Sequence, residues 1–220
     1  MTKFIIGLGQ FQRHVYPKFA GKFRELAKGQ KPQALMITCA DSRIDPSLVL
    51  QCEPGDLFCV RNAGNMAPAG VDDESGVAAA VEFAVEGLGI RDIVLCGHSD
   101  CGAMKALLHP ELAEGKPSLA RWLRHAEPAR AAACQHDETH DELCRMTHKN
   151  IVAQLNNLSE YPVVKRAVSS GTVNLHGWYY DFSAGEIHSF DSEAGRFKPL
   201  CLPAGSVNPG AWWQGASTAA

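Results

Sequence analysis

A short, continuously apolar run, Ala34-Leu-Met-Ile-Thr-Cys39, sets the framework within which this chain can fold. It lies between Pro32 and an Asp-Ser turn, and a run of this length without alternation is typical of a strand that is buried on both faces. Apolar runs at 57–61 and 93–96 have the same character, and helical patterns follow them. This alternation predicts an α/β fold with a mostly parallel central sheet and flanking helices.

The remaining segments complete this architecture. The segments at 172–181 and 186–191 resemble two strands joined by a turn at 183–185, so they predict an antiparallel edge strand on the sheet. Residues 2–28 have the amphipathic periodicity of one or two helices, with Pro17 as the break between them. Further helices are expected at 45–52, 76–88, 102–108 and within 117–160. The helix at 76–88 is apolar almost all round, which predicts that it is buried, in the core or against another subunit.

The chain of 220 residues is long enough to form one sizeable core. We divide it into an N-terminal helical arm at 1–30, an α/β domain with the candidate site at 31–201, and a loose tail at 202–220 that is rich in Pro, Gly, Ser and Ala. The tail contains Trp212 and Trp213, which we expect to pack against the protein itself rather than to act as an interaction peg.

The charge pattern excludes several classes of partner. The formal net charge is −3, with 45% hydrophobic and 20% charged residues, so the chain offers no basic field for nucleic acid or an anionic membrane. The N-terminal apolar run is short and soon becomes polar, and no later stretch is apolar enough for a transmembrane helix. We therefore expect a cytoplasmic protein with a small-molecule substrate.

The chain has eight cysteines, and in a reducing compartment we expect them to be free thiols rather than disulfides. Cys52, Cys59 and Cys96 occur in apolar contexts, where a cysteine commonly acts as a small buried hydrophobic residue. The absence of a Cys-x-x-Cys pair makes a redox dithiol enzyme the weakest functional alternative.

Two turns at strand ends carry the metal-binding side chains. Cys39 ends one strand, and the turn after the strand at 93–96 contains His98 and Cys101. Because loops at the carboxyl ends of neighbouring parallel strands meet at one edge of the sheet, these residues can act as three ligands of one tetrahedral zinc ion. Asp41 could fill the fourth position or stand just outside it. Each turn alone is a weak signal, and the simpler interpretation is a buried Cys and a capping Asp at each.

The two turns together give a more specific resemblance. The motifs Cys39-Ala-Asp-Ser-Arg43 and His98-Ser-Asp-Cys101, with Arg61-Asn-Ala-Gly-Asn65 and Ser75-Gly76 between them, resemble the signatures of the β-class carbonic anhydrases, in their plant-type and bacterial subgroup. The resemblance extends from about Phe19 to Asp181. It implies an enzyme, a carbonate dehydratase of the lyase class, that works as a homodimer or tetramer with N-terminal helices wrapped around a partner subunit.

The resemblance also implies a mechanism and site residues. A zinc-bound hydroxide would hydrate carbon dioxide reversibly to bicarbonate and a proton, because zinc lowers the pKa of bound water to about 7. Asp41 would accept a hydrogen bond from this hydroxide, and Arg43 would hold Asp41 through a charge-assisted pair. In some members of the family the Arg releases the Asp, which then binds the zinc. The implied substrate-binding residues are Gln30, Phe58, Ala63, Phe83 and Gly102.

Alternatives remain open from the sequence. The same fold and zinc site also support hydrolysis of carbonyl sulfide or carbon disulfide, and a non-catalytic zinc-stabilised scaffold module is a third hypothesis. Asp41, Arg43 and Gln30 argue against the scaffold, since a purely structural site has no use for a hydroxide-orienting pair. A second group of metal-binding residue types is interpreted as a solvated helix with at most adventitious metal binding; it comprises Cys134, His136, His140, Cys144 and His148.

Overall fold

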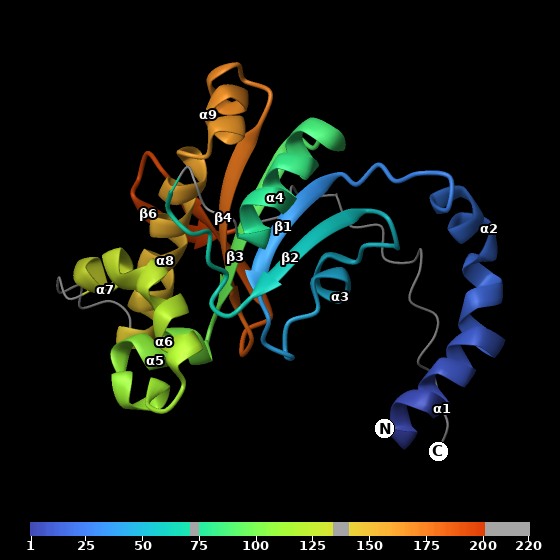
Figure 1. Ribbon diagram of the computed structural model, residues 1–220, viewed down its shortest axis with the longest axis horizontal. Coiled ribbons are helices and arrows are strands. Elements are labelled where there is room, and N and C mark those ends of the chain that lie inside the picture. Colours follow the sequence, from blue (N-terminus) through green and yellow to red (C-terminus); the bar gives the residue numbers. More distant parts are fainter. Residues whose placement is uncertain (71–74, 134–140, 201–220) are drawn as a thin grey trace.

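The computed structural model describes residues 1–70, 75–133 and 141–200 of the chain. Within these residues, six strands form one sheet in the spatial order β2-β1-β3-β4-β5-β6 (Figure 1). They are β1 (Ala34–Cys39), β2 (Leu57–Asn62), β3 (Asp92–His98), β4 (Asn174–Asp181), β5 (Glu186–Asp191) and β6 (Arg196–Pro199). β1 to β4 pair in parallel, and β5 and β6 are antiparallel. The predicted α/β class, with its mostly parallel sheet and antiparallel edge, is confirmed.

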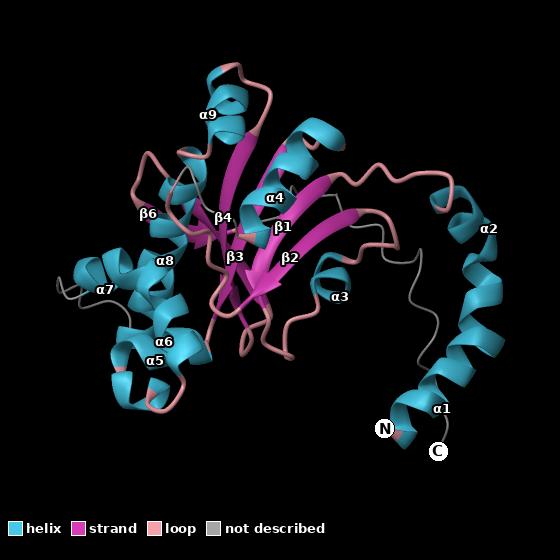
Figure 2. Ribbon diagram, viewed as in Figure 1, coloured by secondary structure: helices cyan, strands magenta, loops and turns pink. Residues whose placement is uncertain are grey.

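Helices cover both faces of this sheet (Figure 2). Those in the described part of the chain are α1 (Thr2–Gln10), α2 (Tyr16–Leu26), α3 (Pro46–Leu50), α4 (Gly76–Glu82), α5 (Gly102–Leu108), α6 (Pro117–Leu123), α7 (Glu127–Ala133), α8 (Glu142–Ser159) and α9 (Pro162–Ser169). Apolar side chains of α4, α8 and α9 form one core cluster with Leu35 and Ile37 of β1. On the opposite face Met36 packs with Leu50 of α3. None of the helices in the described residues has the length and apolar character needed to span a membrane.

The longest helix, α8, lies close to the sheet because two glycines face it. A Cβ at Gly97 would lie 2.9 Å from Ile151 Cδ1, and one at Gly177 would lie 2.7 Å from Leu155 Cδ1. Both distances are shorter than carbon atoms can approach, so a larger residue at either position would require the α8 side chains that pack there to move. The two glycines therefore allow α8 to pack closely on the sheet near the end of β3.

The strand register brings the two sequence motifs to one edge of the sheet. β1 lies between β2 and β3, with Cys39 opposite Asn62 and Thr38 opposite Cys96. All three strands run in the same direction, so the turns that follow Cys39 and His98 leave the sheet side by side. The first and third strands along the chain are thus neighbours in the sheet, which is the condition for the two turns to meet.

The N-terminal helices stand apart from the sheet (Figure 1). A π-helical turn, Phe11–Val15, joins α1 to α2, so the two helices form a nearly continuous rod rather than two helices separated at Pro17. Pro17 lies in the first turn of α2, where its missing N–H costs no hydrogen bond. Large apolar side chains of α1 are exposed in the single chain: Phe4, Ile5, Ile6 and Leu8.

Some details differ from the sequence predictions. The helix predicted at 76–88 is α4 followed by a π-helical turn, Phe83–Gly87, and Phe83 is 50% exposed in the single chain. Burial of this side chain against another subunit stays a prediction. Cys96 is buried as expected, but Cys59 is exposed because it lies on the outermost parallel strand. α9 and β6 were not predicted; both are short, and short elements carry little periodicity. The proposed tail at 202–220 lies outside the described residues.

Candidate metal centre

Three side chains meet where β1 and β3 end. One ligand atom from each of Cys39, His98 and Cys101 lies within 4.8 Å of the other two, and all three residues are buried. Cys39 is the last residue of β1 and His98 the last residue of β3, while Cys101 is the N-cap of α5. The structure therefore brings together the three residues that the sequence predicted as ligands.

The His98 ring is oriented by its backbone neighbour. Its Nδ1 lies 2.7 Å from the Ser99 carbonyl oxygen, so Nδ1–H donates this hydrogen bond and the Nε2 lone pair is left available. Nε2 is buried and has no hydrogen-bond partner within the described residues. Burying a polar nitrogen without a partner is unfavourable, and a metal ion bound at Nε2 removes this cost.

The thiols of Cys39 and Cys101 differ in how readily they ionise. A hydrogen bond from Cys101 lowers the pKa of the Cys39 thiol to about 4, and the hydrogen bond from the Gly64 N–H acts in the same direction. The same contact with Cys39, together with burial, raises the pKa of Cys101. Without a cation the pair therefore holds one thiolate and one thiol. Two adjacent thiolates repel each other, and a dication relieves that repulsion.

Gly64 brings a backbone N–H to this sulfur pair, 3.4 Å from Cys39 Sγ. Its φ of +80° lies in the left-handed region, and a Cβ there would lie 2.8 Å from Met66 Cε and 2.9 Å from Ala103 Cβ. Only glycine satisfies both conditions without strain. The loop after β2 is thus shaped to approach Cys39 closely.

These observations fit a tetrahedral zinc ion. Two sulfurs and one imidazole nitrogen are ligands that zinc prefers, and three protein ligands leave one position open, as in catalytic sites. Among the residues that the structure describes, Nε2 of His98 has no hydrogen-bond partner and the thiol pair carries one negative charge; a bound dication explains both features better than an ordinary hydrophobic core does.

Zinc binding is expected to release about one proton at about pH 6, because Cys39 is already a thiolate and Cys101 is still a thiol before the metal binds. At this pH a water at the open zinc position, with a pKa of about 7, stays largely protonated and adds little to the release. Two ordinary thiols would together release nearly two protons at this pH. Calorimetric titration of the metal-free protein with zinc, in buffers of different ionisation enthalpy, measures this number. A release close to two protons would contradict the charge assignment.

Asp41 lies beside the cluster but is bound by an arginine. The Arg43 Nε donates to Asp41 Oδ1 at 3.0 Å, and its Nη2 donates to Asp41 Oδ2 at 2.8 Å, so the pair is bidentate. These hydrogen bonds hold the pKa of Asp41 well below its usual range. Asp41 is therefore a carboxylate at neutral pH and can only accept hydrogen bonds.

Arg61 supports the same turn from β2, and the sequence reasoning assigned it no role. Its Nε donates to the Cys39 carbonyl oxygen at 3.1 Å, and its Nη2 donates to the Asp41 carbonyl oxygen at 2.8 Å. Arg61 belongs to the motif at 61–65 that supports the family resemblance, but that motif does not identify its contacts. Arg61 thus fixes the backbone that carries both the ligand and the acid.

Polar side chains of α8 hold the loop that contains Gly64, and these too were missed. Asn150 Nδ2 donates to the Gly64 carbonyl oxygen at 3.0 Å, and Gln154 Oε1 accepts from the Ala67 N–H at 2.8 Å. Asn150 and Gln154 are fully buried, and they are one helical turn apart on α8. Polar residues at this spacing resemble a solvated helix face in sequence, so their burial depends on tertiary packing.

The expected substrate-binding residues fall into two groups. Ala63 and Gly102 adjoin the cluster: Ala63 precedes Gly64, and Gly102 follows Cys101 at the start of α5. Phe58 is paired with Leu35, four residues before Cys39 on β1, and its ring lies 6.0 Å from that of Phe83.

Gln30 is exposed and lines a separate groove with Phe23, Leu26 and Gly55. Phe58, Phe83 and Gln30 therefore do not line the metal cluster of their own chain. A role for these three residues remains a prediction that requires a partner subunit.

The second cysteine and histidine group forms no metal cluster within the described residues. Cys144 and His148 are half-buried on α8, with Sγ and Nε2 3.7 Å apart. The His148 ring stacks on Phe197 at 4.1 Å and meets Tyr179 edge-on at 4.6 Å, so the pair is packed against β4 and β6 rather than solvated. Cys134, His136 and His140 lie outside the described residues.

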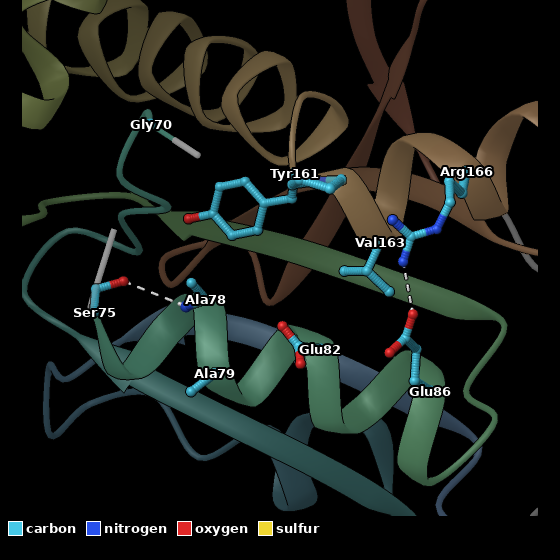
Figure 3. A pocket seen from close by; sticks show the side chains of 10 residues that line it. Gly70, Ser75, Ala78, Ala79, Glu82, Glu86, Tyr161, Val163 and Arg166 are labelled. Atoms are coloured by element: carbon cyan, nitrogen blue, oxygen red, sulfur yellow. Dashed lines mark hydrogen bonds and ion pairs between the residues drawn. The ribbon is translucent and has the colours of Figure 1, made fainter. Parts of the chain in front are cut away.

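A separate cavity of about 420 Å³ lies between α4 and α9 (Figure 3). Its lining includes Glu82 and Tyr161, and the Glu86–Arg166 ion pair at 2.7 Å lies at one side. The cavity contains none of the three metal-binding side chains. It is therefore not part of the candidate metal centre.

Comparison with known proteins places the chain in a family. The family profile described as carbonic anhydrase matches residues 34–187, more than half of the 220-residue chain. The carbonic anhydrase of Pseudomonas aeruginosa is 46% identical over 202 residues, covering 91% of this chain and 92% of that protein. The solved β-carbonic anhydrase CcaA is 39% identical with a TM-score of 0.86, covering 90% of this chain and 98% of that one. The chain belongs to the β-class carbonic anhydrases.

Membership of the β-class carbonic anhydrases agrees with the geometry of the site. These are zinc enzymes, and the Cys39-His98-Cys101 cluster is consistent with zinc binding. Assembly is also a property of structural neighbours: a tetrameric β-carbonic anhydrase from Sordaria macrospora is 28% identical with a TM-score of 0.74, covering 86% of this chain and 97% of that chain.

Proposed function

We propose that this protein catalyses the reversible hydration of carbon dioxide to bicarbonate and a proton, with zinc held by Cys39, His98 and Cys101. The observation that carries the proposal is the ionised Asp41, paired bidentately with Arg43 beside a cluster that supplies only three ligands. A structural zinc site is normally closed by four protein ligands. A site with three ligands and a fixed carboxylate next to it is suited to holding a reacting water.

The roles of the protein groups follow from their charges and contacts. When bound, zinc supplies Lewis acidity that makes a hydroxide nucleophile available near neutral pH. Asp41 is acceptor-only, so its carboxylate can accept a hydrogen bond from the O–H of that nucleophile and leave an oxygen lone pair directed at the substrate carbon. Arg43 keeps the carboxylate ionised and oriented. Because the pKa of Asp41 is lowered, this acceptor role is lost only at strongly acidic pH.

Zinc content and carbon dioxide hydration of the purified protein test this proposal directly. We expect about one zinc per chain and rapid hydration in a stopped-flow indicator assay. Activity on carbonyl sulfide or carbon disulfide, measured on the same preparation, tests the alternative hydrolase. Efficient hydrolysis of either sulfur compound with negligible carbon dioxide hydration would favour that alternative, and zinc binding without any turnover would favour a scaffold.

We propose a homodimer, or a larger assembly built from it, as the active form, located in the cytoplasm. The apolar side chains of α1 are exposed to an unusual degree for a soluble chain, with Phe4 73% and Ile5 64% exposed. A partner subunit that covers this rod would bury them, and the same partner could bring its Gln30, Phe58 and Phe83 close to the metal centre.

Removal of the N-terminal rod is expected to break this assembly. A variant that lacks residues 1–26 should elute as a smaller species than the full chain, since exposed apolar surface drives stable association. Light scattering coupled to size-exclusion chromatography measures the mass. The double substitution Lys3→Ala and Arg13→Ala on the same rod is the control, because it leaves the apolar side chains in place. An unchanged mass after the deletion would show that the rod does not hold the subunits together.

A further inference from the structure

Asp100, between His98 and Cys101, has a backbone conformation that few residues adopt. Its φ is +57°, in the left-handed region, where most side chains are strained and Asp is one of the few that are tolerated. Outliers of this kind persist when the surrounding structure requires them, and they often occur at functional sites. The conformation turns both the carbonyl and the carboxylate of Asp100 toward one neighbour, Arg43.

The guanidinium of Arg43 is held between two aspartates. Besides its two bonds to Asp41, its Nη1 donates to Asp100 Oδ2 at 2.6 Å and its Nη2 donates to the Asp100 carbonyl oxygen at 2.9 Å. The fork of an arginine has five N–H donors arranged in one plane. These contacts fix the plane in the orientation that serves Asp41.

Two further groups complete the clamp. The guanidinium carbon lies 5.0 Å from the centroid of the Phe182 ring, within the range of a cation–π contact. Lys105, on the first turns of α5, forms an ion pair with the other carboxylate oxygen of Asp100. Asp100 is therefore itself held in place while it holds Arg43.

The contacts with Asp100 matter because, without them, the Arg43 side chain would hold the Asp41 carboxylate only weakly. Its side chain is 48% exposed, and a single exposed ion pair contributes little and is easily exchanged for water. Asp41, in contrast, is only 17% exposed and belongs to a residue type that binds metals. If the Arg43 side chain swings into solvent, Asp41 Oδ1 keeps only the backbone N–H of Arg43 at 3.0 Å, and Oδ2 loses the Nη2 donor that fixes the carboxylate plane.

We propose that Asp100 is a positioning residue for the reaction: by clamping Arg43 it keeps Asp41 paired and correctly oriented beside the metal centre. This inference rests on the proposed function for its catalytic consequence, but the clamp itself can be measured without turnover. Asp100 would then affect the reaction through Arg43 and Asp41, without contacting the substrate itself.

The test compares Asp100→Asn with Glu127→Gln in the zinc-loaded full-length protein. Glu127 forms an ion pair of similar exposure with Arg130 on α7, at 2.9 Å, so it is a matched control far from the cluster in the chain. The first readout is the rate at which phenylglyoxal modifies Arg43, followed by peptide mass spectrometry with Arg166 as the internal reference. The second is kcat and KM for carbon dioxide hydration.

In Asp100→Asn we expect Arg43 to react about fivefold faster and kcat to fall about tenfold with little change in KM, while Glu127→Gln matches the wild type. An Arg43 reactivity that matches the control would overturn the clamp, and a raised reactivity with unchanged kcat would overturn its importance for the reaction. If the wild type does not hydrate carbon dioxide, the proposed function fails, and the Arg43 reactivity still decides whether Asp100 clamps it.

A second variant, Lys105→Met, tests the same contact in case Asp100→Asn does not fold. Lys105→Met leaves Asp100 and its turn intact but removes the ion pair that holds its carboxylate. We expect a smaller increase in Arg43 reactivity, about twofold, in the same direction. No increase in Lys105→Met, together with a failure of Asp100→Asn to fold, would also count against the clamp.

Discussion

Replacement of Cys39 by serine is expected to abolish zinc binding and carbon dioxide hydration together. A serine hydroxyl is a poor zinc ligand, and the substitution removes the thiolate whose pKa is about 4, the group that carries the negative charge of the cluster before the metal binds. Loss of a group that only supports a zinc ligand weakens binding 10- to 100-fold, so loss of the ligand itself should weaken it by more than about 100-fold.

The control for this experiment is Cys96→Ser. Cys96 is also buried at the end of the same sheet, but its Sγ contacts the Gly97 carbonyl oxygen, a bond that a serine hydroxyl can replace. It should keep one zinc per chain by elemental analysis and most of the activity. Full activity of a zinc-free Cys39→Ser protein would disprove the proposed function, whereas loss of zinc in both variants would indicate only a general loss of folding.

Replacement of Asp41 by asparagine is expected to leave zinc bound and to lower kcat about 100-fold. The amide keeps the shape of the side chain but has no charge, and one of its ends donates hydrogen bonds where the carboxylate only accepts them. It also loses the bidentate pair with Arg43. Losses of this size are typical when one hydrogen-bonding group that orients a reacting atom is removed. Zinc content and stopped-flow hydration measure the two effects separately.

Asp45→Asn provides a matched control four residues along the chain. Asp45 caps α3 by accepting from the N–H groups of Ser47 and Leu48, and asparagine is an equally good cap, so activity and stability should be unchanged. Loss of zinc in Asp41→Asn would assign Asp41 to holding the metal centre together. Wild-type kcat in that variant would remove Asp41 from the mechanism.

The local pattern of the chain was enough to predict most of the fold. The apolar run at Ala34–Cys39 and the runs near 57–61 and 93–96 are strands. A continuously apolar strand must be buried on both faces, since a solvated face would expose every second side chain to water. The strand at Asp92–His98 proved longer than predicted, since its last residues are a glycine and the ligand His98, which carry no apolar signal. The elements α9 and β6 were not anticipated because they are only eight and four residues long, and such short elements carry little periodicity.

The candidate site was predictable as far as its three ligands and, through the family resemblance, the Asp41–Arg43 pair. The spacing of Cys39, His98 and Cys101 relative to two strand ends was sufficient, because parallel neighbouring strands bring such ends together. The supporting contacts of Arg61, Asn150 and Gln154 were not predictable. Each is a polar residue whose partner is a backbone atom distant in sequence, and no local pattern identifies that partner.

The sequence by itself therefore determined the chemistry available at the site: two thiols, an imidazole, an aspartate and an arginine in two turns. Tertiary structure alone decided how that chemistry is arranged. Within the described residues it left Nε2 of His98 buried without a hydrogen-bond partner, placed one negative charge on Cys39 rather than on Cys101, and brought Asp100 against the same guanidinium that holds Asp41. The physical reason is that ligand identity depends on side-chain type, whereas orientation and protonation depend on distances between segments that only the folded sheet brings together.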